Sequence, residues 1–451
     1  MKKIVLLVVS LFLVSYSTII YLMKNDRLSF VSSLLSTEQI QLIKEYVFPY
    51  RVIKEQKKQI SELEDYYSPL ELDVIFRSLP KIPVIKNKDI KLSNLQNLES
   101  FKLDDGFRYG INISYSGSGY IDFHQNNLIV LSARGVLGYT QNIEKTLHLE
   151  QIKNNIDDFI GLEQFQKSHK FSVKDLFIYK NKIYVSFTEE IETDCWNTSI
   201  IYSEMSYDEI IFKRFFSSEK CVHSKNNKDG EFEALQSGGR IINLDDNILL
   251  TVGDYRSRFL AQDNKSINGK IIKINTENLQ YEILTMGHRN PQGLLVDKEQ
   301  NIMLATEHGP MGGDEINLIE IEKLDNKKPL NYGWAISSAG EHYGEKENEK
   351  NIEKYKKYPL HNSHSEFGFI EPLKSFVPSI GISEIAKIGN NKYVVSSLKD
   401  NSLYFFELKE KKIINLERVE MFERIRDLIF KDNNIYLFLE NSASIAILAI
   451  K

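Results

Sequence analysis

The chain has 451 residues, of which 42% are hydrophobic and 11% aromatic. This content supplies a large buried core and excludes global disorder. The formal net charge is −5, the pI is about 6.1 and the sequence has no long basic run, so nucleic acid is not expected as the main partner.

The first segment predicts a membrane anchor over residues 1–23. Residues 4–23 carry no charge, and a helix of about 20 residues spans a bilayer core of roughly 30 Å. The alternative is a cleaved signal peptide, whose apolar region is usually about 7–15 residues long. We favour the uncleaved anchor because Tyr16, Tyr21 and Met23 occupy the region where a cleavage site needs small residues. In both cases we expect the rest of the chain in the periplasm or outside the cell.

Residues 24–96 are expected to form a helical extension. Ser36 is suited to cap a helix, and Ile40, Ile43 and Val47 follow it at helical spacing. The extension could be a stalk or an oligomerisation helix, or it could pack on the main domain. The pattern favours neither of these alternatives.

From residue 97 onward the pattern changes to short strands. An Asn- or Asp-rich turn followed by a short apolar strand occurs six times, and these strands begin at Leu128, Ile183, Ile248, Ile302, Tyr393 and Ile435. Turn-and-strand units repeated about every 40–60 residues are typical of propeller blades. We therefore expect an all-β fold, a six-bladed β-propeller, over residues 97–451. A Lys- and Glu-rich stretch at 341–367 lengthens one spacing and is predicted to be a solvated loop.

Two cysteines, Cys195 and Cys221, are present. In an exported protein such a pair is a candidate disulfide, and the alternative is two free thiols. Two cysteines without nearby histidine ligands do not predict a zinc site.

Seven segments carry a resemblance to a known family. The three strongest are GHRNPQGL (287–294), EHGPMGGDEINLI (307–319) and NYGW (331–334). The weaker ones are SGGRI (237–241), TVGD (251–254), SSLKDNSLYFF (396–406) and ERIRDLI (423–429). Taken in their order along the chain, they resemble the soluble glucose dehydrogenase and aldose sugar dehydrogenase family, six-bladed propellers that use pyrroloquinoline quinone (PQQ) and calcium. The resemblance covers about residues 230–430; residues 97–230 match poorly and 1–96 do not match.

The resemblance assigns the expected PQQ-binding residues. PQQ is a planar tricarboxylate, and the family binds it with a lysine and an Arg-x-Arg pair, which fall here on Lys399, Arg424 and Arg426. Guanidinium groups suit carboxylates geometrically. Arg289 and Asn290 match the pair that flanks the quinone, where a cation stabilises charge that develops on the reduced oxygen.

The resemblance also implies a calcium site. Gly309 and Pro310 match residues whose main-chain carbonyls hold the ion, and hard oxygen ligands suit calcium. The nearby acids Asp314 and Glu315 are interpreted as structural residues that bond loop amides.

The proton acceptor of the family is missing. Its histidine lies just before the segment aligned with SGGRI, and Gln236 stands at that position. An amide can bond a hydroxyl but takes no proton near neutral pH. General-base assistance is typically worth about 10²–10⁴-fold in rate. The loss therefore predicts slow turnover.

Other candidate groups are assigned supporting roles. His288 and His308 are interpreted as loop-supporting histidines, although His308 is the best substitute base if turnover is brisk. Asp254 is interpreted as a turn residue and His223 as a solvent-exposed histidine.

Two functions follow as hypotheses. The first is a membrane-anchored PQQ-dependent sugar dehydrogenase that passes hydride from an aldose to the quinone. The alternative is a catalytically inactive propeller that binds a glycan or a protein at the cell envelope. A calcium-dependent lactonase is disfavoured, because the carboxylate and Asn ligands of such a site are not evident. The sequence specifies neither the sugar nor the electron acceptor.

Overall fold

The computed structural model describes residues 81–86, 98–103, 118–140 and 148–161, and then the chain up to 450 apart from short gaps within 162–169 and at 325–327. All of these residues belong to one compact unit, Pro69–Lys451. The proposed anchor, residues 1–23, lies outside the described residues. None of the helices in the described part of the chain is long and apolar enough to cross a membrane.

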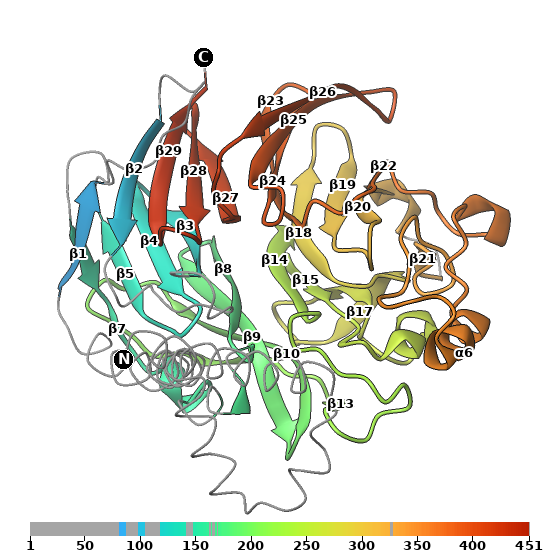
Figure 1. Ribbon diagram of the computed structural model, residues 1–451. Helices are drawn as coiled ribbons and strands as arrows, with labels where there is room; N and C mark the ends of the chain where they lie inside the picture. The colour runs from blue at the N-terminus through green and yellow to red at the C-terminus, as the bar shows by residue number, and fades with distance from the viewer. Residues whose placement is uncertain are drawn as a thin grey trace, which may run out of the picture. The chain divides into compact units, whose positions relative to one another are not determined.

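Six four-stranded antiparallel blades make up the domain (Figure 1). The inner strands are β3 (Gly119–His124), β8 (Val173–Tyr179), β14 (Gly238–Leu244), β18 (Pro291–Asp297), β23 (Ile382–Gly389) and β27 (Ile425–Lys431). The second strands are β4 (Asn127–Ser132), β9 (Lys182–Glu192), β15 (Asn247–Val252), β19 (Ile302–Glu307), β24 (Lys392–Ser397) and β28 (Asn434–Leu439).

The outer half of each blade contains two further strands. The third strands are β5 (Leu137–Thr140), β10 (Cys195–Glu204), β16 (Lys270–Ile274), β20 (Asp314–Glu320), β25 (Ser402–Lys409) and β29 (Ser444–Ala449). The fourth strands are β6 (His148–Gln151), β12 (Lys213–Phe216), β17 (Tyr281–Met286), β22 (Lys374–Phe376), β26 (Lys412–Glu420) and β2 (Leu98–Leu103). Short accessory strands are β1 (Lys81–Lys86), β7 (Lys153–Asn154), β11 (Glu209–Ile210), β13 (Val222–His223) and β21 (Leu330–Asn331).

The six-blade prediction is confirmed. Each of the six repeated strands is the second strand of its own blade. The preceding turn residues explain the pattern: Asp245, Asn301 and Asn391 have φ of 53°, 54° and 55° and close the hairpin between inner and second strand. Asn and Asp tolerate this left-handed conformation better than other side chains with a Cβ.

Consecutive inner strands are joined into a closed ring. They contact one another in the order β3, β8, β14, β18, β23, β27 and back to β3. Aspartates bridge some of these steps: Asp122 Oδ2 accepts from Ile178 N at 2.6 Å, and Asp175 Oδ2 accepts from Ile241 N at 2.7 Å. A buried carboxylate that accepts main-chain N–H groups satisfies donors that an inner strand would otherwise leave unpaired.

The ring is closed by strands from opposite ends of the chain. β2 pairs with β29, so residues near position 100 complete the blade that contains the C-terminal strands. β1 in turn pairs with both β2 and β6.

This arrangement corrects one expectation. Lys81–Lys86 lies inside the range 24–96 predicted to be helical, yet it is a strand, β1. The segment KIPVIK contains Pro83, which a helix interior does not accommodate. Its residues pair with two neighbouring strands instead. The remainder of 24–96 lies outside the described residues.

The stretch at 341–367 is more ordered than predicted. It contains α6 (Glu349–Lys357), which Asn348 caps by accepting from Lys350 N. Lys354 of this helix lies within 2.5 Å of a Glu231 carboxylate oxygen. The basic residues at its C-terminus also favour the helix through its dipole. The Lys- and Glu-rich sequence that was predicted to be a loop therefore contains a helix.

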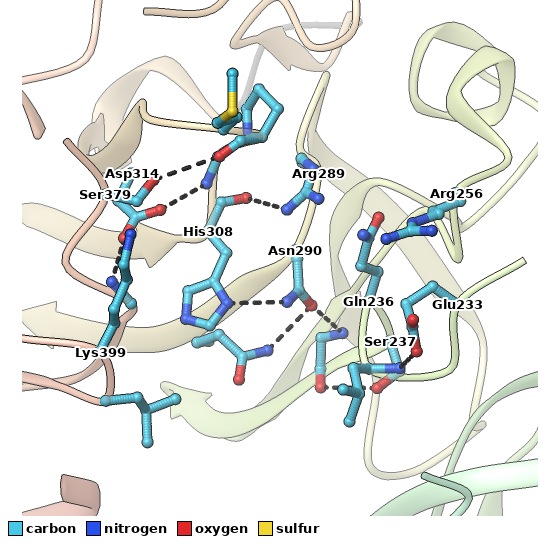
Figure 2. A pocket seen from close by; sticks show the side chains of 18 of the residues that line it. Glu233, Gln236, Ser237, Arg256, Arg289, Asn290, His308, Asp314, Ser379 and Lys399 are labelled. Atoms are coloured by element: carbon cyan, nitrogen blue, oxygen red, sulfur yellow. Dashed lines mark hydrogen bonds between the residues drawn. The ribbon is translucent and has the colours of Figure 1, made fainter. Parts of the chain in front are cut away.

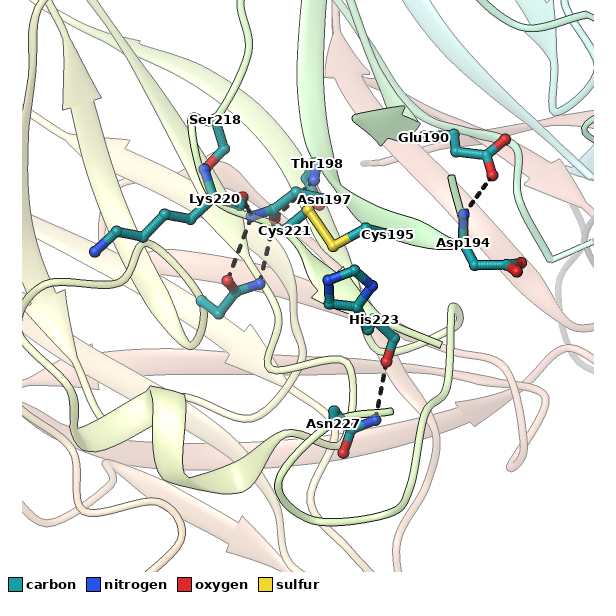
Figure 3. Close-up of a disulfide and its surroundings, with 11 residues drawn as sticks. Glu190, Asp194, Cys195, Asn197, Thr198, Ser218, Lys220, Cys221, His223 and Asn227 are labelled. Atoms are coloured by element: carbon teal, nitrogen blue, oxygen red, sulfur yellow. Dashed lines mark hydrogen bonds between the residues drawn. A yellow bond between two sulfur atoms is a disulfide. The ribbon is translucent and has the colours of Figure 1, made fainter. Parts of the chain in front are cut away.

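The disulfide prediction is confirmed. Cys195 and Cys221 are bonded, with a Cα–Cα distance of 5.3 Å (Figure 3). The bond links the start of β10 to the segment before β13. Beside it, Trp196 stacks on Phe171 with ring centroids 3.6 Å apart.

Candidate functional site

A cavity of about 340 Å³ lies where the inner strands begin. Strand starts and preceding loops from all six blades line it, so residues far apart in the sequence meet there. Every site residue expected from the sequence is among the lining residues: Gln236, Arg289, Asn290, Gly309, Pro310, Lys399, Arg424 and Arg426. The structure thus brings these residues together, while their roles stay predictions.

Arg289 and Asn290 form the buried wall of the cavity (Figure 2). Arg289 Nη1 donates to the His308 carbonyl at 3.0 Å, and its guanidinium lies 5.5 Å from the centre of the Trp334 ring. Asn290 Oδ1 accepts from Gly238 N at 3.1 Å. Burial lowers the pKa of Arg289. The loop GHRN therefore holds a cation and an amide in fixed positions at the cavity.

Gln236 is held by hydrogen bonds on both sides of its amide. With its oxygen turned toward the arginines, the side chain accepts from Arg289 Nη2 at 2.7 Å and from Arg256 Nε at 3.2 Å. Its nitrogen then donates to Asp254 Oδ1 at 3.1 Å. An amide satisfied in this way has no basic lone pair to take a proton. The position expected to hold the base is occupied by a fixed neutral group.

Asp254 does more than close a turn, contrary to the expectation from the sequence. It is fully buried, its Oδ2 accepts from Trp334 Nε1 at 2.7 Å, and its Oδ1 accepts from Arg256 N at 2.8 Å. Burial raises its pKa, against the opposing effect of Arg289. Asp254 thus connects the TVGD segment, the NYGW segment and Gln236.

The predicted PQQ cations lie on two adjacent blades. Arg424 Nε and Arg426 Nε each contact one oxygen of Glu440, at 3.0 and 2.7 Å. Ser118 Oγ donates to the same carboxylate at 2.7 Å. The two arginines lower the pKa of Glu440 although burial opposes them. Lys399 is exposed at the cavity, and no carboxylate pairs with it among the described residues.

The predicted calcium loop is rigid. Asp314 Oδ1 accepts from Gly309 N at 3.0 Å, and Oδ2 accepts from Gly381 N at 2.6 Å. Asp314 is therefore structural, as expected. A Cβ on Gly309 would lie 2.0 Å from the Gly313 carbonyl oxygen, so only glycine fits. Within the described chain, no group of three or more His, Cys, Asp or Glu side chains is arranged to hold a metal ion.

The histidines differ in their environments. His288 is buried away from the cavity and contacts Thr285 Oγ1 at 2.8 Å and Glu307 Oε1 at 3.2 Å, so it supports the loop. His223 is exposed on β13. His308 lines the cavity, and its buried Nε2 has no hydrogen-bond partner among the described residues. Burial lowers its pKa, which favours the neutral imidazole.

A buried charge cluster links inner strands outside the cavity. Arg240 contacts Asp175 Oδ1 at 2.6 Å and Asp427 Oδ1 at 3.0 Å, and it also pairs with Glu384. Burial raises the pKa of Asp175 to about 8. One cation shared by three carboxylates ties together inner strands of four blades.

Sequence reasoning missed Glu440 and Lys174. Glu440 directly follows the apolar strand β28, and Lys174 stands between Val173 and Asp175 at the start of β8. In both cases the only hint in the sequence was a charged residue at one end of an apolar strand. Which partner each charge would meet depends on another blade.

Taken together, the fold and the site define a class of protein: a six-bladed β-propeller with a cation-lined pocket at one end of its channel. Residues 169–448 match the family model described as Glucose / Sorbosone dehydrogenase. The chain therefore belongs to the glucose/sorbosone dehydrogenase family.

Relatives of known sequence agree with this assignment. The chain is similar to aldose sugar dehydrogenase YliI of Escherichia coli, at 23% identity over 59% of this chain and 72% of the relative. It is 26% identical to an uncharacterized Synechocystis protein over 44% of this chain, and this match spans 52% of that relative's length.

Solved structures share the fold. The apo form of the Escherichia coli soluble aldose sugar dehydrogenase has a TM-score of 0.58 at 18% identity, over 78% of this chain and 98% of that chain. The PQQ-bound aldose sugar dehydrogenase of Streptomyces coelicolor has a TM-score of 0.55, also at 18% identity and the same coverage.

Proposed function

We propose that this protein is a PQQ-dependent sugar dehydrogenase that oxidises an aldose slowly, because Gln236 stands where a base is required. The observation that carries the proposal is the convergence of Lys399, Arg424, Arg426 and Arg289 on one cavity. Family membership and the PQQ-bound relative support it.

The residues present fit a planar tricarboxylate. Lys399, Arg424 and Arg426 supply cations on one side of the cavity, and Glu440 orients both arginines through their Nε atoms. Arg289, just before β18, supplies a further cation to the same cavity. When bound, PQQ supplies an acceptor for the two electrons of a sugar C1 hydride.

Calcium fits less completely. Gly309 and Pro310 would contribute main-chain carbonyls, and calcium usually takes about 6–8 oxygen ligands. Ser379 Oγ also lies 3.4 Å from the Pro310 carbonyl. Two carbonyls would leave most positions to the cofactor and water. We propose calcium on the resemblance of this loop to the family and on its rigidity.

The proton of the sugar hydroxyl needs an acceptor. Gln236 can orient the hydroxyl but cannot take its proton. His308 is the alternative acceptor, since its ring lines the cavity and burial favours the neutral imidazole. Its Nδ1 faces the donating Asn290 Nδ2 at 3.5 Å, so Nδ1 is the nitrogen that carries a lone pair in the neutral ring. A base with a lowered pKa is weak, which is consistent with slow turnover.

We also propose that the propeller works outside the cytoplasm, in the periplasm or at the cell surface, anchored through residues 4–23. The Cys195–Cys221 disulfide supports this, because such bonds persist in oxidising compartments.

The deciding experiment is reconstitution of purified protein with PQQ and calcium, followed by a dye-coupled assay on a panel of aldoses. Saturable PQQ uptake with slow oxidation of at least one aldose is expected. Failure to take up PQQ would refute the proposal and leave a propeller that binds a glycan or protein.

A further inference from the structure

Lys174 is a buried lysine in the wall of the cavity. It lies near the start of β8 and is 7% exposed. Its Nζ donates to the Lys170 carbonyl at 2.8 Å. No carboxylate forms an ion pair with it within the described part of the chain. An ammonium group offers three donors, and a buried one without a counter-charge is costly.

The surroundings of Lys174 are mostly cationic. Arg426 of β27 and Lys170 disfavour its charge, and Glu233 favours it but is itself paired with Lys170 at 2.9 Å. Tyr120 of β3 lines the same wall. Burial is the main reason that the pKa of Lys174 falls to about 7, and Arg426 adds to it.

Charged neighbours on the other packed strands are already satisfied. Asp175 follows Lys174 on β8 but pairs with Arg240 of β14, and Asp122 of β3 accepts from two main-chain N–H groups. Next to Lys174, Gly239 has φ of +120°, and a Cβ there would lie 2.3 Å from the Lys174 Cβ. The glycine thus makes room for this side chain at the wall.

We propose that Lys174 is an additional anion-binding residue of this pocket, whose ammonium group binds a carboxylate of the PQQ and takes up a proton from solvent as the ligand binds. The inference rests on the proposed function. A ligand carboxylate would provide the counter-charge that no described residue supplies. It would lie beside Arg426, on the side of the cavity where the predicted PQQ cations gather.

Proton uptake sets the pH dependence. Below the pKa of the empty pocket Lys174 is already protonated, so binding takes up no proton there. Above it, the neutral amine must be protonated for the contact to form. Affinity therefore falls as pH rises above about 7, by up to tenfold per pH unit, until the pKa of the bound form is reached.

The test is calorimetric titration of the full chain with PQQ and calcium at pH 6 and at pH 8, with the pH 8 titration in two buffers of different ionisation enthalpy. The variants are Lys174→Met, which removes the charge, and Lys174→Arg, which makes it permanent. The control is Lys182→Met, because Lys182 is a partly exposed residue of β9 outside the cavity that pairs with Glu204. Far-ultraviolet circular dichroism and thermal unfolding establish that each variant is folded.

Wild type and Lys182→Met are expected to take up close to one proton when PQQ binds. In Lys174→Met and Lys174→Arg, the residue at position 174 should take up no proton. Lys174→Met should weaken binding at least tenfold at pH 6, whereas Lys174→Arg should retain binding. Equal affinity and equal proton uptake in Lys174→Met would overturn the inference and leave the proposed function intact. Absence of PQQ binding by wild type would refute the proposed function, and the inference with it.

Discussion

Glu440 Oε1 accepts a hydrogen bond from Arg426 Nε at 2.7 Å, both side chains are buried, and Arg426 lines the cavity. The same carboxylate also contacts Arg424, so one acid offsets two cations. This relationship orients the guanidinium groups before any ligand binds. It also reduces the positive charge available to an anion.

Glu440→Gln should therefore have opposite effects on stability and binding. Without the carboxylate, the buried Arg426 and the half-buried Arg424 lose the negative charge of Glu440, and the free energy of unfolding should fall by about 3–5 kcal/mol. Affinity for a tricarboxylate such as PQQ should rise, because the arginine charges are no longer offset. Urea unfolding with and without PQQ measures both.

Glu417→Gln is the matched control for that substitution, since Glu417 is an exposed residue of β26. It should change neither quantity by more than about 0.5 kcal/mol. If Glu440→Gln were as stable as wild type, the carboxylate would not be the group that holds the arginines.

Gln236→His should raise kcat by about 10²–10⁴-fold with little change in PQQ affinity. Asp254 lies next to this position and would accept from the new imidazole, which would orient it. Steady-state kinetics of the PQQ- and calcium-loaded protein on an aldose measures the change.

His308→Gln separates the two candidate bases. In the wild-type background it should abolish the residual activity if His308 accepts the proton, and in the Gln236→His background it should have a smaller effect on kcat. Brisk wild-type turnover that survives His308→Gln would exclude both assignments.

Stability should fall as pH rises from 4 to 8 because of Asp122. Burial raises its pKa from 3.8 to about 7 in the folded protein. The folded state thus holds a proton that the unfolded state has lost, so its contribution is complete below pH 4 and is lost as pH passes 7. The slope should be up to about 1.4 kcal/mol per pH unit. Asp122→Asn should flatten this slope in urea unfolding, and the exposed Asp208→Asn should leave it unchanged.

Loss of the Cys195–Cys221 bond should lower the free energy of unfolding. The two residues are 26 positions apart, and closing a loop of that length in the unfolded chain is worth about 3–4 kcal/mol. The double substitution to serine should show this loss in urea unfolding, and the wild type treated with a reductant should match it. Equal stability of reduced and oxidised wild type would contradict the prediction.

Local patterns were sufficient to locate the blades. The six turn-and-strand repeats lie on second strands, because hairpin turns need residues that tolerate positive φ and second strands are buried on both faces. The presence of two cysteines was also enough to predict the disulfide. The helical expectation failed at Lys81–Lys86, where pairing with two distant strands decides the conformation.

For the candidate site too, some features were predictable from the sequence and others only from the structure. The resemblance to the family was enough to predict Arg289, Asn290 and Gln236 as parts of one pocket, and the structure places all three at the cavity. Only the tertiary structure shows that Glu440 offsets the arginines and that no carboxylate of the described residues forms an ion pair with Lys174. Both facts depend on contacts or distances between blades. The environment of a buried charge is set by the groups that surround it in space, and the separation of those groups along the sequence does not reveal which of them will meet.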